Sequence, residues 1–272
     1  MVLELAIIQR AIIGGIMAGF ATALIGVFVV KMNLSSIGYC MSHAAFAGAA
    51  LGVALSLDPL YTALGFSAFM SLIIGPLSDK ARLHADVIIG VLFSLNMALA
   101  FIFMSLFPQR PLTREAVNVL WGSILAIKQQ DLYFLAAVLV ATLVAVKLTW
   151  KELQAIMYNR KLAEADGITT QPYVYAVVFL TGLVVTLGLK LVGGLLVFAL
   201  LFNPASACFQ VLDDLKKIVA LAPVLGALSC LLGLFLSLAV DWPVGSCIAV
   251  VSTLILLVAV AISPKRRVVS GR

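Results

Sequence analysis

Charged residues are scarce in this chain of 272 residues. Only 11% of its residues are Asp, Glu, Lys or Arg, whereas 63% are hydrophobic, and the mean hydropathy is +1.17. Soluble globular domains carry about 25% charged residues, so this composition excludes a soluble fold and indicates a polytopic membrane protein. The net charge of +6 lies at the ends of apolar segments rather than along one helix face, which argues against nucleic acid as a partner.

Several motifs of catalysis are absent. The chain has no Gly-x-x-x-x-Gly-Lys-Ser/Thr loop for a nucleotide phosphate, no His-Glu-x-x-His helix and no Gly-x-Ser-x-Gly turn. We therefore expect neither an ATPase site nor another enzyme activity. There are only two histidines, His43 and His84, and His84 lies in a basic loop. A metalloenzyme needs about three protein ligands around an open position, so we expect no permanently bound cofactor.

Paired cysteines and deeply placed acids are also missing. Cys40, Cys208, Cys230 and Cys247 are scattered in apolar surroundings without a Cys-x-x-Cys pair, which argues against a disulfide framework or a zinc finger. None of the 12 acidic residues lies clearly in the middle of an apolar segment. Proton-coupled transport normally uses such a buried carboxylate, so a secondary transporter is disfavoured.

Long apolar runs cover nearly the whole chain, so we expect a single all-α membrane domain over residues 1–272. Because several runs are short and separated by tight turns, one or two of them are candidates for re-entrant or broken helices. The sequence thus predicts eight or nine transmembrane helices. The candidate segments are residues 7–30, 36–57, 60–77, 86–107, 131–149, 172–189, 191–211, 218–240 and 243–263.

The distribution of basic residues predicts an orientation. With nine crossings, all of the 18 Lys and Arg residues fall on one side except Arg10, Arg110, Arg114, Lys128 and Lys190. Cytoplasmic loops are enriched in Lys and Arg, so the C-terminus is expected in the cytoplasm of a cell-membrane protein. An apolar stretch between Pro108 and Gln130, on the outer side, is too short to span and is expected to dip into the membrane or to lie along its surface.

His43 stands out because it lies in an apolar helix of small residues. Ionisable side chains inside the bilayer are costly and usually functional. Cys40 is three residues earlier on the same helical face, so a thiol and an imidazole could bind one transition-metal ion. The alternative is a structural histidine that is hydrogen-bonded to a neighbouring helix, and the motif alone leaves both interpretations open.

Other features suggest how the helices pack and move. Glycine pairs at four-residue spacing, Gly15 with Gly19 and Gly48 with Gly52, predict close helix contacts. Asn203-Pro204 lies within an apolar run, where proline removes a backbone donor, so we expect a broken helix that lines the path or a tolerated kink.

The polar stretch from Lys151 to Gln171 is expected to form a charged helix that ends at Gly167. Such a helix is either a solvated connector or a docking element for a cytoplasmic motor. Its charged residues Lys151, Glu152, Glu164 and Asp166 are therefore candidates for coupling to an ATPase. Asp86, at the edge of the fourth segment, is either a solvated acid or a gating residue.

Five motifs in order resemble the integral membrane permeases of ATP-binding-cassette importers for zinc, manganese and iron. The family's Gly-Asp-Ala-x-Ser-His-Ala-x-x-Pro-Gly is similar to residues 38–48, and its Val-Gly-x-Leu-Leu-Val run ending in Pro-Ala is similar to residues 192–205. Residues 86–94, 120–132 and 151–167 resemble its fourth segment, its Phe-Gly-x-x-Leu stretch and its cytoplasmic helix.

This resemblance implies a function and partners. The partners are a cytoplasmic ATP-binding subunit, an extracytoplasmic metal-binding protein, a second identical or homologous permease and the lipid bilayer. His43 would contribute to a transient site for a divalent metal ion, which is the substrate. Tyr39, Ser42, Asp86, Asn203 and Pro204 are the candidates for lining or gating the path.

One departure from the family motif bears on the substrate. The family has an aspartate four residues before the histidine, where this chain has Tyr39. If Cys40 replaces that acid, the cysteine–histidine pair favours softer ions such as zinc over manganese. The alternatives are a permease of the same type for another substrate, a stand-alone secondary transporter or channel, and, with little support, an intramembrane enzyme.

Overall fold

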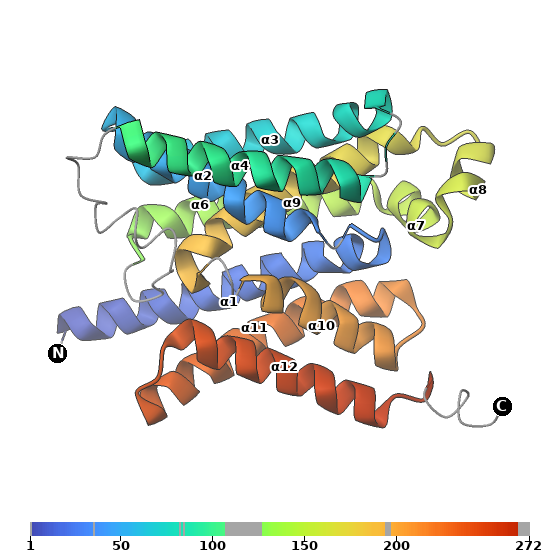
Figure 1. Cartoon of the computed structure of the whole chain (residues 1–272). Coiled ribbons are helices and arrows are strands. Elements are labelled where there is room, and N and C mark those ends of the chain that lie inside the picture. The colour runs from blue at the N-terminus through green and yellow to red at the C-terminus, as the bar shows by residue number, and fades with distance from the viewer. Residues whose placement is uncertain are drawn as a thin grey trace.

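The computed structural model describes residues 2–34, 36–81, 83, 85–106, 127–193 and 197–265, and every regular element in these residues is a helix (Figure 1). The elements are α1 (Val2–Lys31), α2 (Ile37–Leu55), α3 (Pro59–Ala81), α4 (Ala85–Leu106), α6 (Gln129–Leu148), α7 (Trp150–Tyr158), α8 (Arg160–Ala165), α9 (Thr170–Val192), α10 (Val197–Val211), α11 (Leu215–Val240) and α12 (Val244–Ile262).

Eight of the described helices are long and apolar enough to cross a membrane, namely α1, α2, α3, α4, α6, α9, α11 and α12. The apolar helix α10 has 15 residues and so spans only about 22 Å, less than the ~30 Å of a bilayer core. The expectation of an all-α protein with eight or nine crossings is therefore confirmed. α1 begins at one end of the bundle, and α12 ends at the opposite end, on the side of α7 and α8 (Figure 1).

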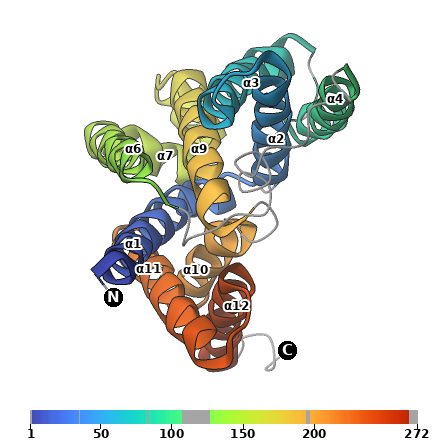
Figure 2. The same cartoon turned by 90° about the vertical axis from the view of Figure 1, so that its left-hand side faces the viewer.

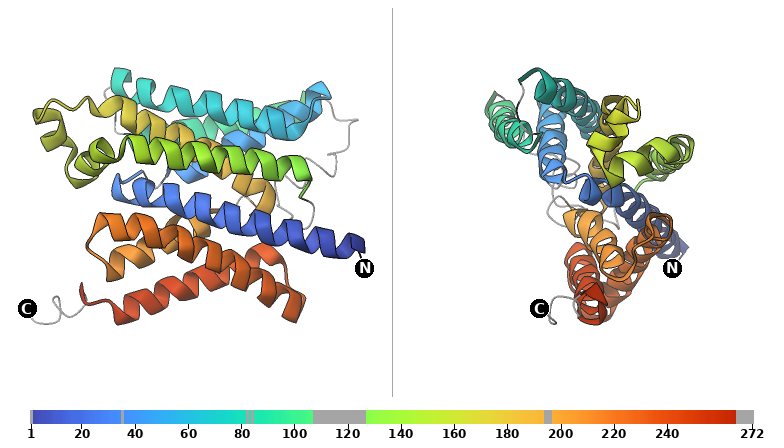
Figure 3. Two further views of the ribbon diagram at one scale, coloured as in Figure 1. Left: turned by 180° about the vertical axis from the view of Figure 1, so that it is seen from behind. Right: turned by 90° about the vertical axis from the view of Figure 1, so that its right-hand side faces the viewer.

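Two helices connect the two halves of the bundle. α1 and α9 pack against each other; α2 and α3 contact α9 on one side, and α10 and α11 contact α1 on the other. The end-on views show α2, α3 and α4 as one group and α10, α11 and α12 as another, with α6 at the flank (Figures 2 and 3). Most of the contact between the two groups therefore runs through α1 and α9, and α2 and α10 make only a small direct contact.

Glycines allow the closest helix contacts, as the sequence predicts. A Cβ atom added to Gly19 of α1 would overlap with the carbonyl oxygen of Gly226 in α11, and one added to Gly48 or Gly52 of α2 would overlap with Thr62 of α3. These helices therefore meet backbone to backbone, a geometry that larger residues would prevent.

α10 continues through Pro204, so the structure supports the second of the two interpretations of Asn203-Pro204, a tolerated proline, and not the broken helix. The side chains around it, Leu200, Leu201 and Ala205, are fully buried, and this packing compensates for the hydrogen bond that proline removes. The preceding helix α9 runs past Lys190, where we expected a turn, and ends at Val192. Gly193 follows with φ of 102°, a conformation that side-chain-bearing residues rarely adopt.

The polar segment after α6 forms two short helices rather than one. α7 buries Leu153, Ile156 and Met157, and its capping neighbour Asn159 starts α8. The Asn159 side chain accepts hydrogen bonds from the backbone N–H groups of Lys161 and Leu162 at 3.0 and 3.2 Å. This local capping explains why the helix restarts at Arg160.

Candidate functional site

His43 lies near the start of α2, about 9 Å along the helix axis from Ile37. Its side chain is half-buried, and its ring meets the ring of Phe93 in α4 edge to face, with 4.6 Å between the centroids and an interplanar angle of 89°. The imidazole therefore lies at the contact of α2 with α4 and remains partly open on one side.

Cys40 faces the same neighbouring helix but is completely buried. The Asn96 amide in α4 donates hydrogen bonds to the Cys40 carbonyl oxygen at 3.4 Å and to the Cys40 sulfur at 3.7 Å. The thiol is thus held against α4 in this conformation and is closed to a passing ion.

Asn96 is a site residue that the sequence analysis did not identify. It is fully buried, and its amide oxygen Oδ1 has no hydrogen-bond partner in the part of the chain that the structure describes. A buried amide with one free oxygen costs about 1–3 kcal/mol, so its retention beside Cys40 needs a reason. The available signal was the single amide side chain of the largely apolar segment 86–107.

Ser42 is also buried, and its hydroxyl oxygen likewise has no partner among the described residues. Residues two apart on a helix point to different faces, so Ser42 does not face α4 together with Cys40. The structure therefore places Cys40 and His43 together but leaves Ser42 apart from them.

Tyr39 lies one helical turn before His43 on the same face of α2. Its side chain is 48% exposed and stacks on Phe198 of α10, with 4.0 Å between the ring centroids and a tilt of 31°. Tyr39 and His43 thus share a partly open face of α2, where Tyr39 contacts α10 and His43 contacts α4.

The described residues contain no group of three or more His, Cys, Asp and Glu side chains that could hold a metal ion. His43 and Cys40 are at most two protein ligands, and Asn96, which contacts Cys40, adds an amide oxygen. Such a sparse set is suited to an ion that binds briefly and leaves, because conduction needs weak and reversible contacts.

The other predicted path residues lie elsewhere. Asp86 is exposed in the first turn of α4, two turns before Phe93. Asn203 faces α12, where its amide donates hydrogen bonds to Ser252 at 3.1 Å and Thr253 at 3.0 Å. Pro204 is buried beside it. His84 and most of the stretch between Pro108 and Gln130 lie outside the described residues.

The predicted coupling residues lie at one end of the bundle. Lys151 and Asp166 are exposed, and Glu152 is half-buried. Glu164 Oε1 accepts hydrogen bonds from the Thr170 hydroxyl at 2.5 Å and from Arg160 Nε at 3.0 Å. These hydrogen bonds, with Thr170 as the main contributor, lower the pKa of Glu164. Glu164 therefore ties α8 to the start of α9.

The sequence also did not predict a buried ion pair at the opposite end of the bundle. The Lys190 ammonium lies 2.7 Å from Asp131 Oδ1, and the two side chains are 17% and 7% exposed. Asp131 also accepts a hydrogen bond from the backbone N–H of Lys128 at 2.9 Å, which caps α6. The pair joins the start of α6 to the end of α9.

Comparison with known proteins assigns the chain to a family. Residues 4–263 match the model of the ABC 3 transport family. The manganese import system permease protein ScaB of Streptococcus gordonii is 30% identical over 260 residues, which are 96% of this chain and 92% of that protein. A probable iron transport system membrane protein of Haemophilus influenzae is 30% identical over 262 residues, or 96% and 89% of the two chains.

A solved structure agrees with this assignment. PsaBC from Streptococcus pneumoniae, in complex with Fab, superposes with a TM-score of 0.82 at 27% identity, covering 96% of this chain and 93% of that chain. The helix arrangement and the sequence thus match along nearly the whole length, and the chain belongs to the ABC 3 transport family.

Proposed function

We propose that this chain forms the translocation path of an ATP-driven importer in which His43 and Cys40 contact the passing metal ion. The chain is the permease component of an ABC importer for manganese, iron or zinc ions, and ATP hydrolysis belongs to a separate protein. The single observation that carries this function is the family match over residues 4–263.

We infer the remaining partners from the family and from the open face of α2. Tyr39 and His43 lie on a partly exposed face, so a second permease copy placed there would supply a second imidazole and complete the coordination of the ion. An extracytoplasmic metal-binding protein would deliver the ion at the end of the bundle opposite to α7 and α8. The lipid bilayer surrounds the subunit, and nothing in its charge pattern supports binding to nucleic acid.

The orientation follows from the basic residues. Lys147, Lys151, Lys216 and Lys265 all lie at the end that carries α7 and α8. Because positive charge concentrates on the cytoplasmic side, this end faces the cytoplasm and the C-terminus lies there. α7 and α8 are then the docking elements for the ATPase, with Lys151, Glu152 and Asp166 as contact residues and Glu164 as a residue that positions α8.

The expected ion preference follows from the ligand atoms. Tyr39 brings a phenol where the family motif has a carboxylate, and Cys40 brings a thiol. Thiol and imidazole ligands prefer zinc to manganese, so zinc is the proposed substrate even though the relatives are named for manganese and iron.

The conformation described here is closed at this site, because Cys40 is buried against Asn96. Metal binding by both residues therefore requires α2 and α4 to separate. The hydrogen bond between Asn96 and Cys40 is long, so breaking it costs little, about 0.5–1.5 kcal/mol for a neutral hydrogen bond.

ATP-dependent uptake tests the proposal directly. The permease and its ATPase are reconstituted in sealed vesicles, and uptake of zinc, manganese and iron is compared for wild type, His43→Ala, Cys40→Ser and the matched control His84→Ala. We expect uptake of one ion to fall in both site variants and not in the control. Unchanged uptake in both variants would overturn the site, and ATP-independent uptake driven by a proton gradient would overturn the function.

A further inference from the structure

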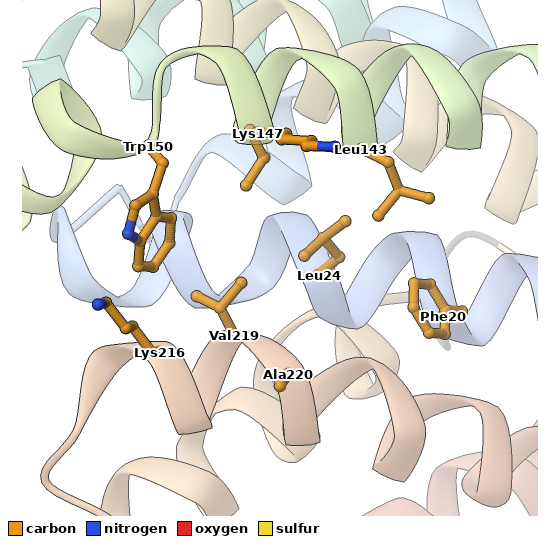
Figure 4. A pocket seen from close by; sticks show the side chains of 9 residues that line it. Phe20, Leu24, Leu143, Lys147, Trp150, Lys216, Val219 and Ala220 are labelled. Carbon is orange, nitrogen blue, oxygen red and sulfur yellow. The ribbon is translucent and has the colours of Figure 1, made fainter.

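A groove with a volume of about 570 Å³ opens between α1, α6 and α11, close to the end of the bundle that carries α7 (Figure 4). α6 and α11 both pack against α1, and in the described residues they have no extensive contact with each other. The groove lies in the gap between them, with α1 as its floor. It is separate from the α2–α4 contact that holds His43.

The polarity of the groove changes along its length. Its two charged residues, Lys147 in the last turn of α6 and Lys216 in the first turn of α11, lie at the membrane–water boundary. One helical turn deeper on the same faces follow the apolar residues Leu143 and Val219. A polar end that continues into an apolar interior matches the polarity of a phospholipid.

An aromatic side chain completes the charged end. Trp150, the first residue of α7, lies above α1 between Lys147 and Lys216 (Figure 4). Tryptophan prefers the headgroup level of a membrane, where its ring is apolar and its N–H group can donate a hydrogen bond. The groove therefore offers two cations and one N–H donor at the depth of a lipid phosphate.

The floor of the groove suits an acyl chain. Phe20 and the almost completely buried Leu24 lie one turn apart on α1, and Leu143, which is 41% exposed, forms part of the open rim. The groove thus opens sideways from the bundle, where lipid tails have direct access.

We propose that this groove is a specific binding site for an anionic glycerophospholipid. The lipid phosphate lies beside Trp150, and the flexible side chains of Lys147 and Lys216, whose ammonium groups point away from each other in Figure 4, turn towards it. One acyl chain runs along Phe20 and Leu24. Basic pockets between transmembrane helices bind acidic headgroups for the same electrostatic reason. A bound lipid fills the space between α6 and α11 and so links the start of the α7–α8 segment to α1.

The charges around the groove support an anionic occupant rather than a zwitterionic one. The two acids that precede α11 in the chain already have partners. Asp214 caps the helix by accepting a hydrogen bond from the backbone N–H of Lys216 at 2.9 Å, and Asp213 forms an ion pair with Lys265 at 2.8 Å. Lys147 and Lys216 have no ion pair within the described residues. The preference is electrostatic, so it weakens at high salt.

Fluorescence quenching in lipid nanodiscs tests the proposal on the whole chain. In a Trp121→Phe/Trp242→Phe background, Trp150 reports on the groove. Phosphatidylglycerol with brominated acyl chains is compared with equally brominated phosphatidylcholine at the same mole fraction. We expect phosphatidylglycerol to quench Trp150 several-fold more strongly, and inorganic phosphate in the buffer not to compete.

Charge variants identify the residues responsible. Lys147→Gln/Lys216→Gln should lower the preference for phosphatidylglycerol by about fivefold per lysine, the usual contribution of one basic side chain at an anionic membrane surface. The control Lys80→Gln/Lys217→Gln removes the same charge outside the groove lining and should keep the preference. The proposal is overturned if both lipids quench wild type equally, if neither does because a protein segment fills the groove, if inorganic phosphate competes, or if the groove variant retains the preference.

Discussion

Lys190 and Asp131 form a largely buried ion pair of 2.7 Å, which joins the end of α9 to the start of α6. Burying two charges is costly, and the cost is offset only while both are present. The pair therefore stabilises the contact between α6 and α9 at the end of the bundle opposite to α7 and α8.

Removing one partner of this pair should destabilise the protein strongly. Asp131→Asn leaves the Lys190 ammonium buried without a counter-charge and should cost about 3–5 kcal/mol. Asp131→Leu/Lys190→Met removes both charges and should cost only about 1 kcal/mol, because the α6 cap is lost. Thermal unfolding in nanodiscs measures the difference. The control Asp213→Asn, at an exposed ion pair, should change little.

A second prediction concerns the close contact between α1 and α11. Gly19→Ala places a methyl group against the carbonyl oxygen of Gly226, so α1 and α11 must move apart and the melting temperature should fall. Gly65→Ala is the matched control, because a Cβ atom there meets nothing within 4 Å. That variant should be neutral or more stable by about 0.5–1 kcal/mol, since alanine favours the helix. Equal melting temperatures in the two variants would contradict the packing argument.

A third prediction concerns access to Cys40. In a Cys208→Ser/Cys230→Ser/Cys247→Ser background, Asn96→Leu removes the donor that holds Cys40 against α4. Alkylation of Cys40 should then be roughly two- to tenfold faster, as expected for the loss of one neutral hydrogen bond of about 0.5–1.5 kcal/mol.

The matched control for this experiment is Asn203→Leu, which removes an amide that bonds to α12 instead of α2. It should leave alkylation of Cys40 unchanged. Zinc added during ATP turnover should protect Cys40 if the thiol binds the passing ion. An unchanged rate in Asn96→Leu would show that helix packing alone, and not this hydrogen bond, closes the site.

The short charged helix α8 should respond to acid. The folded pKa of Glu164 is lowered, mainly by the hydrogen bond from Thr170, so its ionised form stabilises the link to α9. This stabilisation is present above the ordinary glutamate pKa of about 4.3 and is lost as the pH falls through the lower folded value.

Hydrogen exchange of the α8 amides can test this pH dependence. Protection should stay constant from pH 7 to about pH 5 and fall below that range, and Glu164→Gln should abolish the dependence. Asp166→Asn, at an exposed residue of the same segment, serves as the control. A decline that begins near neutral pH would contradict the assignment to Glu164.

The transmembrane helices could be predicted from the sequence because apolar runs and bilayer thickness determine them directly. The boundary between α9 and α10 could not be predicted, because the sequence offers several residues at which a helix could end. Lys190 stays in the helix because Asp131 neutralises it, and Pro204 stays in the helix because its neighbours are buried. The positive φ of Gly193, rather than the charge or the proline, marks the end of α9.

The candidate site could be predicted only in part. Helical spacing correctly put Cys40 and His43 on one face, and the structure shows that both face α4. The spacing could not show that Asn96 comes from 56 residues away to bind Cys40, because a contact between helices is not encoded in the periodicity of either one. For the same reason, the pairing of Lys190 with Asp131 could not be predicted.

The departure at Tyr39 gives the sharpest test of ion preference. Tyr39→Asp places a carboxylate one turn before His43 on the same face of α2, as in the family motif, and adds a hard anionic ligand. Carboxylates suit manganese, whereas imidazole and thiol ligands suit zinc, so the ratio of manganese to zinc uptake should rise by about tenfold. The change also removes the stacking on Phe198, worth about 0.5–1.5 kcal/mol, so some stability is lost in any variant at this position. Tyr39→Asn loses the same stacking without adding charge, and it should leave the ratio unchanged. If both variants shift the ratio equally, the size of the side chain at residue 39 selects the ion, and the ligand argument fails.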